Sequence, residues 1–286
     1  MTLQQALQEA QTQLARAGIT EPHREAWILL AALLNQSRAW VMSHPQATLT
    51  PHQQRRLHRW LQRRAQREPL PYITHRRWFY GLELEIRRGV LIPRPETELL
   101  VARFLEWART TTPPHETRTL VDAGTGSGAI ALACLTHAPN WQAIGTDRSL
   151  RALQIANKNR QKFGISQRFL LARMHWLSAL RSHSVHAVLS NPPYVLPEEW
   201  SALEPEITHW EPRTALLVLQ QDPLQPYREL AHQARSVLVS GGLLLMEISP
   251  HRAYALCDLL VQLGYCAVQS YADLAGHLRI VQGFVE

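Results

Sequence analysis

The sequence predicts an α/β protein in which an open, mostly parallel sheet with helices on both faces follows an all-helical amino-terminal domain. Two observations support this fold class. From Thr119 onward, short apolar runs alternate with helix-like segments, which is typical of parallel strands joined by helical crossovers. In residues 1–68 the apolar residues recur at helical spacing. The sequence therefore predicts a helical domain followed by an α/β domain.

The amino-terminal helices are predicted from periodicity and from their end signals. Leu3 to Ala17 carry apolar residues at helical spacing, and Gly18 follows as a stop. Pro22 begins a second helix, and the pair Thr50-Pro51 opens a third, because proline is tolerated in the first turn of a helix. We therefore expect a small helical bundle at the start of the chain.

A glycine-rich turn follows the first apolar run of the sheet. The run ends in Asp122, and the alternating glycines after it lead into a helix that starts at Ala129. Glycines permit a tight turn and a close approach of a ligand to the backbone, and the helix start presents free N–H groups. A second apolar run ends in Asp147, about 20 residues further on, which is the spacing of a ribose-binding carboxylate. This arrangement fits a nicotinamide dinucleotide or S-adenosylmethionine, and an acid two residues before the first glycine favours S-adenosylmethionine.

A second motif, Asn191-Pro192-Pro193-Tyr194, follows the apolar run 185–190. It should lie where that strand ends, at the edge where open α/β sheets bind ligands. The Asn191 oxygen and a carbonyl of the stiff proline backbone offer two acceptors, which suit the two donors of a planar NH2 group. Taken alone, the tetrapeptide is also compatible with a proline-rich turn that merely ends a strand.

With both motifs present, the chain resembles the HemK/PrmC-type protein-(glutamine) methyltransferases over nearly its whole length. Stretches outside the two motifs contribute to the resemblance, including one that general methyltransferases do not carry, Leu91 to Leu100. The segments that resemble the family are 71–73, 79–82, 91–100, 122–130, Asp147, 191–194 and 211–216.

The resemblance implies a seven-stranded, mostly parallel, Rossmann-like class I methyltransferase sheet. It also implies transfer of a methyl group from S-adenosylmethionine to the side-chain amide nitrogen of a glutamine, which in the release-factor branch lies in the Gly-Gly-Gln motif of peptide chain release factors. The implied cofactor-binding residues are Asp122, Gly124, Thr125, Gly126, Ser127, Gly128, Asp147, Trp176 and Asn191. The implied catalytic residues are Asn191, Pro192 and Tyr194, and the implied substrate-binding residues are Asn191, Pro192, Pro193, Tyr194, Arg94 and Glu96.

Two other substrates remain open. A sister branch methylates a glutamine of a ribosomal protein, and N6-adenine or RNA amino-group methyltransferases use a similar Asn-Pro-Pro-aromatic motif. Three departures from the family pattern bear on substrate or cofactor contacts: His175 stands before Trp176, residues 217–223 replace a glycine-rich stretch, and Ser249 replaces a common glycine.

These inferences suggest three regions. Residues 1–70 are expected to form a helical bundle for substrate recognition, and residues 71–95 a short β-hairpin linker. The linker strands are predicted at Trp78–Ile86 and Gly89–Ile92, and residues 96–286 are predicted to bind S-adenosylmethionine. The closing antiparallel strands are expected at Tyr265–Val268 and Leu278–Phe284.

Charge and composition indicate which kinds of partner the chain can bind and where in the cell it is expected. Residues 1–68 hold nine arginines and four glutamates, and six of the arginines crowd the third helix within residues 55–67. This basic surface suits an acidic release factor, RNA or the ribosome, or it is simply a solvated helix face. Three cysteines without metal-ligand spacing, no apolar run long enough for a membrane and no signal peptide predict a cytoplasmic enzyme without a metal.

Overall fold

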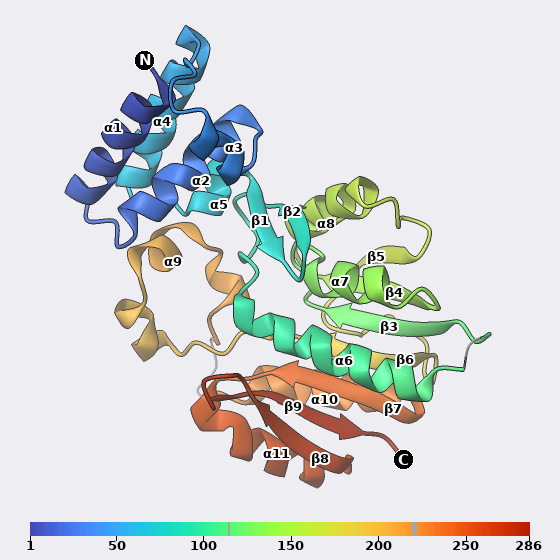
Figure 1. The fold of residues 1–286 in the computed structure, drawn as a ribbon. Helices are drawn as coiled ribbons and strands as arrows, with labels where there is room; N and C mark the ends of the chain where they lie inside the picture. The colour runs from blue at the N-terminus through green and yellow to red at the C-terminus, as the bar shows by residue number, and fades with distance from the viewer. Residues whose placement is uncertain (114, 219–221) are drawn as a thin grey trace. The chain divides into compact units, whose positions relative to one another are not determined.

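The computed structural model describes residues 1–113, 115–218 and 222–286, and these form two compact units (Figure 1). The first unit contains Met1–Arg76 and Leu203–Trp210, and the second contains Arg77–Ala202 and Glu211–Glu286. A short late segment of the chain therefore belongs to the amino-terminal unit, which the sequence did not predict. The division of labour among residues 1–70, 71–95 and 96–286 stays a prediction.

The first unit is a helical bundle around one apolar core. Thr2 and Thr50 each begin a helix with a capping box, in which the threonine side chain accepts from a backbone N–H and a glutamine three residues later returns the bond. The three predicted helices are present, whereas the three shorter ones are too brief for periodicity to reveal. The helices are α1 (Leu3–Arg16), α2 (Pro22–Leu34), α3 (Arg38–Ser43), α4 (Pro51–Ala65), α5 (Leu70–Thr74) and α9 (Pro205–Trp210).

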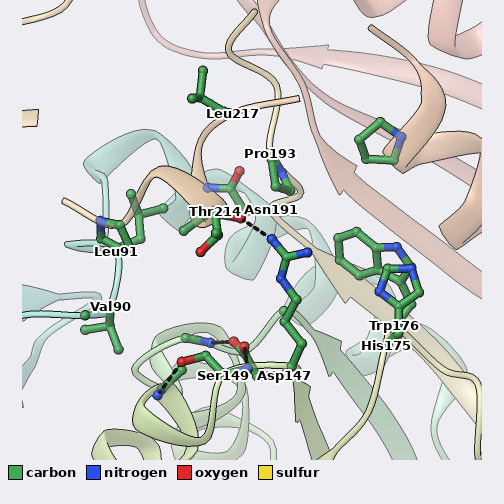
Figure 2. Close-up of a pocket in the computed structure, with 18 of the residues that line it drawn as sticks. Val90, Leu91, Asp147, Ser149, His175, Trp176, Asn191, Pro193, Thr214 and Leu217 are labelled. Atoms are coloured by element: carbon green, nitrogen blue, oxygen red, sulfur yellow. Dashed lines mark hydrogen bonds between the residues drawn. The ribbon is translucent and has the colours of Figure 1, made fainter. Parts of the chain in front are cut away.

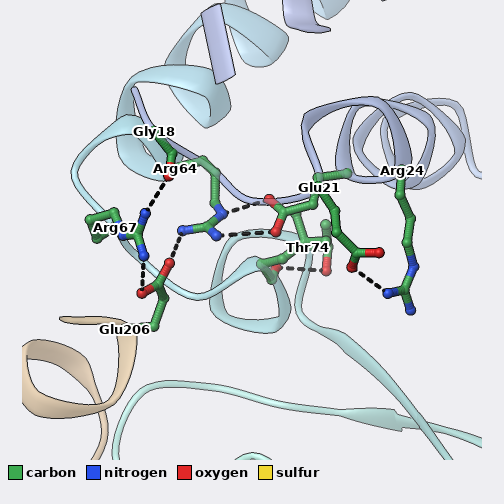
Figure 3. Close-up of polar contacts among 9 residues, drawn as sticks. Gly18, Glu21, Arg24, Arg64, Arg67, Thr74 and Glu206 are labelled. Atoms are coloured by element: carbon green, nitrogen blue, oxygen red, sulfur yellow. Dashed lines mark hydrogen bonds and ion pairs between the residues drawn. The ribbon is translucent and has the colours of Figure 1, made fainter. Parts of the chain in front are cut away.

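An ion-pair network ties α9 into this bundle (Figure 3). The Arg64 side chain, 6% exposed, donates to Glu25 at 2.6 Å and to Glu206 at 2.8 Å. Arg67 donates to the other Glu206 oxygen at 2.8 Å and to the Gly18 carbonyl at 2.9 Å. Glu206 thus receives two guanidinium groups from α4 and its end, which holds the inserted helix to its own unit.

The network reduces the basic surface expected on α4. Besides Arg64 and Arg67, Arg63 is paired, with Glu68 at 2.7 Å. The exposed arginines of this helix are Arg55, Arg56 and Arg59. Half of the six arginines therefore serve internal pairs, and only the amino-terminal half of α4 presents a basic face.

The predicted linker strands are wrong in their placement. The hairpin pairs β1 (Arg76–Phe79) with β2 (Leu82–Glu85). The turn between them, Tyr80-Gly81, has positive φ at both positions, as tight two-residue hairpins require. This turn interrupts the run 78–86, which was predicted as one strand, and residues 89–92 form no strand.

The second unit is built on a seven-stranded sheet, as predicted. Its order is β5-β4-β3-β6-β7-β9-β8, with β7–β9 and β8–β9 antiparallel and the other pairs parallel. The strands are β3 (Arg118–Ala123), β4 (Trp141–Asp147), β5 (Phe169–Arg173), β6 (Val185–Ser190), β7 (Leu238–Glu247), β8 (Cys266–Ala272) and β9 (Leu278–Phe284). The closing antiparallel strands are confirmed.

Helices cover both faces of this sheet (Figure 1). One layer contains α6 (Glu98–Thr111), α7 (Ala129–His137) and α8 (Leu150–Lys162). The other contains α10 (Gln225–Val237) and α11 (Ala253–Gln262), which share a buried apolar cluster with residues of β3, β6 and β7. In the described part of the chain, no helix is long and apolar enough to cross a membrane.

The strand order identifies the edge of the sheet at which a ligand is expected to bind. β3 and β6 are neighbours, and the chain proceeds from them toward opposite sides of the sheet, which defines a topological switch point. Ala123 is in register with Ser190, and Ser190 with Met246. Gly124 and Asn191 therefore directly follow the ends of β3 and β6, and Glu247 is the last residue of β7. All three residues lie at the same edge of the sheet.

Candidate active site

The glycine turn between β3 and α7 takes a conformation that needs its glycines. Gly124, Gly126 and Gly128 have φ of 74°, 55° and 82°, a region that other residues rarely adopt. A Cβ on Gly128 would lie 3.1 Å from the Phe169 ring, so this glycine also permits close packing of α7 on the sheet. The turn is fixed to β4 because the N–H groups of Gly124 and Thr125 both donate to the Thr146 carbonyl.

Asp122 stabilises this turn through hydrogen bonds of its side chain. Its carboxyl is fully buried, and Oδ2 accepts from the Thr125 hydroxyl at 2.7 Å and from the Ala131 N–H at 3.2 Å. Burial raises the pKa of Asp122 to about 6. Asp122, Thr125, Ser127 and Gly128 lie outside the pocket lining, and their predicted cofactor contacts stay predictions.

Asp147 ends β4 beside the turn. Its Oδ2 accepts from the Gly126 N–H at 3.0 Å, and Oδ1 accepts from the Ser149 N–H at 2.8 Å. Burial raises the pKa of this carboxyl, while the two N–H donors favour its ionised form. Each oxygen keeps a lone pair, so the carboxylate can still accept from two neighbouring hydroxyl groups of a ligand.

These residues open onto one pocket (Figure 2). The Arg148 guanidinium donates to the Thr214 carbonyl at 2.9 Å, which joins the β4 side of the pocket to the segment after Glu211. Six predicted site residues line the pocket: Gly124, Gly126, Asp147, Trp176, Asn191 and Pro193. Further lining residues, for which no site role was predicted from the sequence, include Val90, Leu91, Ser149, Thr214, Leu217 and Glu229.

Trp176 and His175 form a further wall of this pocket (Figure 2). A Cβ on Gly124 would lie 3.4 Å from the Trp176 ring, so the absence of a side chain there leaves the ring face open to the pocket. Glu229 of α10 meets His175 at 3.2 Å. His175, which departs from the family pattern, is thereby paired with a carboxyl from another element, 54 positions away in the sequence.

Asn191 follows β6 and lines the pocket with a constrained side chain. Its Nδ2 donates to the Thr97 hydroxyl oxygen at 3.2 Å. The end of the tetrapeptide is held by Arg252, which donates to the Tyr194 carbonyl at 2.6 Å. Burial raises the pKa of the Tyr194 hydroxyl to about 12, so this side chain is neutral at physiological pH. No sequence signal identified Arg252.

Arg94 and Glu96 have different surroundings. Arg94 donates to Glu211 at 2.6 Å, and the same carboxylate accepts from the Ile92 N–H at 3.0 Å. Arg94 therefore fixes the loop 91–95 to the stretch that begins at Glu211. Glu96 is exposed, and neither residue lines the pocket. Their predicted substrate contacts stay predictions.

Glu247, the last residue of β7, is 3% exposed and lies next to this site. Burial raises the pKa of its carboxyl to about 7; the Thr97 hydroxyl, Arg279 and Arg94 oppose this shift, and Glu96 adds to it. A strand-terminal acid was the signal that identified Asp147, and it could have identified Glu247 as well. The other substituted stretch, 217–223, includes residues 219–221, which lie outside the described residues.

The wild-type protein should become less stable as the pH rises through the pKa of Glu247. Replacing Glu247 with Gln should abolish this pH-dependent loss of stability. Because the folded-state pKa lies above the ordinary value, the folded protein binds more protons between about pH 4.5 and 7, and wild-type stability falls across that window. At pH 8 we expect Glu247→Gln to be more stable by on the order of 3 kcal/mol, with little difference at pH 4.5. Urea unfolding at both pH values tests this, with exposed Glu198→Gln as control. Equal differences at both pH values would contradict it.

Within the described residues, no group of His, Cys, Asp or Glu side chains is arranged to hold a metal ion. The strand order, the glycine turn and the acid at the end of β4 define a class I S-adenosylmethionine-dependent methyltransferase. Family models agree with this class: the PrmC N-terminal domain matches residues 5–74, and the methyltransferase small domain matches residues 97–207. The chain belongs to the release factor glutamine methyltransferase family, as its full-length relatives show.

The relatives named release factor glutamine methyltransferase include proteins from three bacteria. The Caulobacter vibrioides protein is 36% identical over 99% of this chain and 96% of its own length. The Coxiella burnetii protein is 36% identical over 98% of each chain, and the Salmonella typhimurium protein 34% identical over 99% of each chain.

Solved structures with this fold are more distant in sequence. A methyltransferase from Pyrococcus furiosus superimposes with a TM-score of 0.51 at 14% identity, covering 71% of this chain and 89% of its own. The Thermus thermophilus 16S rRNA N2 G1207 methyltransferase, in complex with AdoMet and guanosine, gives 0.54 at 16% identity, covering 74% of this chain and 50% of its own. These likenesses concern the fold alone.

Proposed function

We propose that this enzyme transfers the methyl group of S-adenosylmethionine to the side-chain amide nitrogen of the glutamine in the Gly-Gly-Gln motif of peptide chain release factors. The observation that carries the proposal is the position of Asn191 in the pocket, with its amide nitrogen already bonded to Thr97. The amide oxygen is then left to accept a hydrogen bond from a substrate. The names of the full-length relatives supply the substrate class.

The pocket fits the cofactor at three points. Gly124 and Gly126 bring bare backbone to the lining, and Asp147 offers carboxylate lone pairs to ribose hydroxyls. Trp176 offers a flat apolar face for the adenine, and the Glu229 carboxyl beside it can accept from an amino group. When bound, S-adenosylmethionine supplies an electrophilic methyl group.

The proposed role of the tetrapeptide is to orient a weak nucleophile. The nitrogen of a glutamine amide is poorly nucleophilic because its lone pair is delocalised into the carbonyl. The Asn191 oxygen and the Pro192 carbonyl would accept its two protons and aim the nitrogen, while Tyr194 packs beside the planar amide. Catalysis then depends on positioning and on stabilising the positive charge that develops on the amide.

Release factor recognition is assigned to the exposed basic face of α4. Arg55, Arg56 and Arg59 are the arginines of this helix that remain exposed, and they suit an acidic stretch of a protein partner. RNA or ribosome contact is the alternative use of the same charge.

Reversing charge at this face should weaken recognition without affecting chemistry. We expect Arg55→Glu with Arg59→Glu to raise KM for a whole release factor by about tenfold at low salt, with kcat and cofactor affinity unchanged. Steady-state kinetics at two salt concentrations test this, and Arg16→Glu on α1 is the control. An unchanged KM would exclude the face from substrate binding, and a changed affinity for RNA alone would assign it to RNA.

The proposed function is tested by offering labelled S-adenosylmethionine together with unmethylated release factors, ribosomal proteins, RNA or DNA in separate reactions. Label on release factors alone supports the proposal. Label on a ribosomal protein would move the enzyme to the sister branch. Label on nucleic acid alone would show that the tetrapeptide receives an amino group of a base instead of an amide.

A further inference from the structure

The tetrapeptide Asn191-Pro192-Pro193-Tyr194 lacks a common means of holding a backbone in place. Proline has no N–H group, so the two middle residues cannot be anchored by donating hydrogen bonds. The Pro192 carbonyl, which is proposed to accept from the substrate amide, therefore depends on constraints at the two ends of the segment.

The first part of the tetrapeptide is constrained by the sheet and by the proline rings. Ser190, directly before it, is paired with β3 on one side and with β7 on the other. Each proline ring fixes its own φ, and each residue that precedes a proline is held in an extended conformation. The backbone dihedrals that these constraints leave open run from ψ of Pro193 to ψ of Tyr194.

Arg252 binds the tetrapeptide where this freedom remains. It ends the short helical turn Pro250–Arg252 after β7, and its Nη1 donates to the Tyr194 carbonyl at 2.6 Å. Its Nη2 donates to Glu199 at 2.6 Å, and the other Glu199 oxygen accepts from the Leu196 N–H at 2.8 Å. The Arg252 side chain is only 10% exposed, so both charge-assisted bonds are largely shielded from water.

The peptide group between Tyr194 and Val195 is thereby held on both sides. Its carbonyl accepts from Arg252, and its N–H, which belongs to Val195, donates to the Leu216 carbonyl at 2.9 Å. A peptide group is planar, so fixing both its donor and its acceptor fixes its orientation. The chain therefore leaves the tetrapeptide in a defined direction.

Pairing with Glu199 alone does not account for a buried guanidinium. His251, which is exposed, already lies 3.7 Å from the same carboxylate. Burying a cation costs free energy unless its hydrogen bonds are made, and one of the bonds that Arg252 makes goes to the tetrapeptide. The geometry thus connects this residue to the site and not only to an ion pair.

We propose that Arg252 is a positioning residue for methyl transfer. By fixing the peptide group that ends the tetrapeptide, it holds the Pro192 carbonyl in the orientation that accepts from the substrate amide. This role deepens the proposed function and rests on it.

The first test compares substitutions that remove different bonds of Arg252. Arg252→Met removes both bonds, and we expect kcat to fall by about tenfold with the affinity for S-adenosylmethionine within about twofold. Arg252→Lys keeps one donor and should restore kcat to within about threefold of wild type. Glu199→Ala removes the ion pair but keeps the bond to Tyr194, and its kcat should also stay within about threefold. Wild-type kcat in Arg252→Met would overturn the proposal, and so would equal losses in Arg252→Met and Glu199→Ala.

A second readout observes the anchored carbonyl directly and does not depend on activity. Tyr194-Val195 is the only Tyr-Val pair in the sequence, so labelling tyrosine carbonyl carbons and valine nitrogens with NMR-active isotopes gives one cross-peak for this peptide group. Its carbonyl resonance should move upfield in Arg252→Met, because the carbonyl loses a hydrogen bond, and stay near the wild-type position in Glu199→Ala. An unmoved resonance in Arg252→Met would overturn the proposal.

The two readouts separate this inference from the proposed function. If wild-type enzyme methylates no glutamine while the carbonyl resonance responds as expected, the proposed function fails and the anchoring of Tyr194 stands. If Arg252→Met methylates the release factor glutamine at the wild-type rate, the proposed function stands and the positioning role of Arg252 is overturned.

Discussion

Replacing Asn191 with Ala should lower kcat for methyl transfer by about a thousandfold while S-adenosylmethionine still binds within about threefold of the wild-type affinity. The substitution removes the acceptor that aims the substrate nitrogen but leaves the glycine turn, Asp147 and Trp176 in place. Single-turnover kinetics and calorimetric titration of the cofactor measure the two quantities separately.

Asn157→Ala on α8 is the matched control, because Asn157 lies outside the pocket lining and, among the described residues, its side chain bonds only to Arg160 on its own helix. It should leave both quantities unchanged. An Asn191→Ala enzyme that loses cofactor binding and transfer in parallel would contradict the division of roles between the tetrapeptide and the turn.

Asp147→Ala should show the opposite pattern. The carboxylate holds the Gly126 and Ser149 N–H groups and is the proposed acceptor for ribose hydroxyls, so its removal loosens the turn and deletes ligand contacts together. We expect the affinity for S-adenosylmethionine to fall by about 100-fold, with kcat at saturating cofactor within about tenfold of wild type.

Calorimetric titration again gives the affinity, and Asp258→Ala on the exposed side of α11 is the control. If the Asp147→Ala variant bound S-adenosylmethionine with wild-type affinity, the carboxylate would not contribute to cofactor binding. A collapse of kcat at unchanged affinity would instead assign Asp147 to the chemistry.

The fold could be predicted because its signals are local. The strand that ends in Asp122, the glycine turn and the helix from Ala129 are each recognisable within a few residues. The same holds for Asn191 after β6. The hairpin was misplaced because the turn at Tyr80-Gly81 interrupts a run that otherwise reads as one strand.

The partners of individual side chains could not be predicted, because they come from distant parts of the sequence. Arg94 meets Glu211 across 117 positions, and Asn191 meets Thr97 across 94. Charge counts also overestimated the basic helix, since Arg64 finds its second carboxylate in a segment that enters the first unit from late in the chain. Periodicity tells which face of an element is buried, but it does not tell which polar groups meet there.

Mass-spectrometric mapping of the methyl group on a release factor tests the central claim most directly. Unmethylated release factor would be incubated with the enzyme and S-adenosylmethionine beside a variant release factor in which the glutamine of the Gly-Gly-Gln motif is replaced by glutamate. We expect one added methyl group on the side-chain nitrogen of that glutamine and none on the variant. A methyl group at any other position, or equal labelling of the variant, would contradict it.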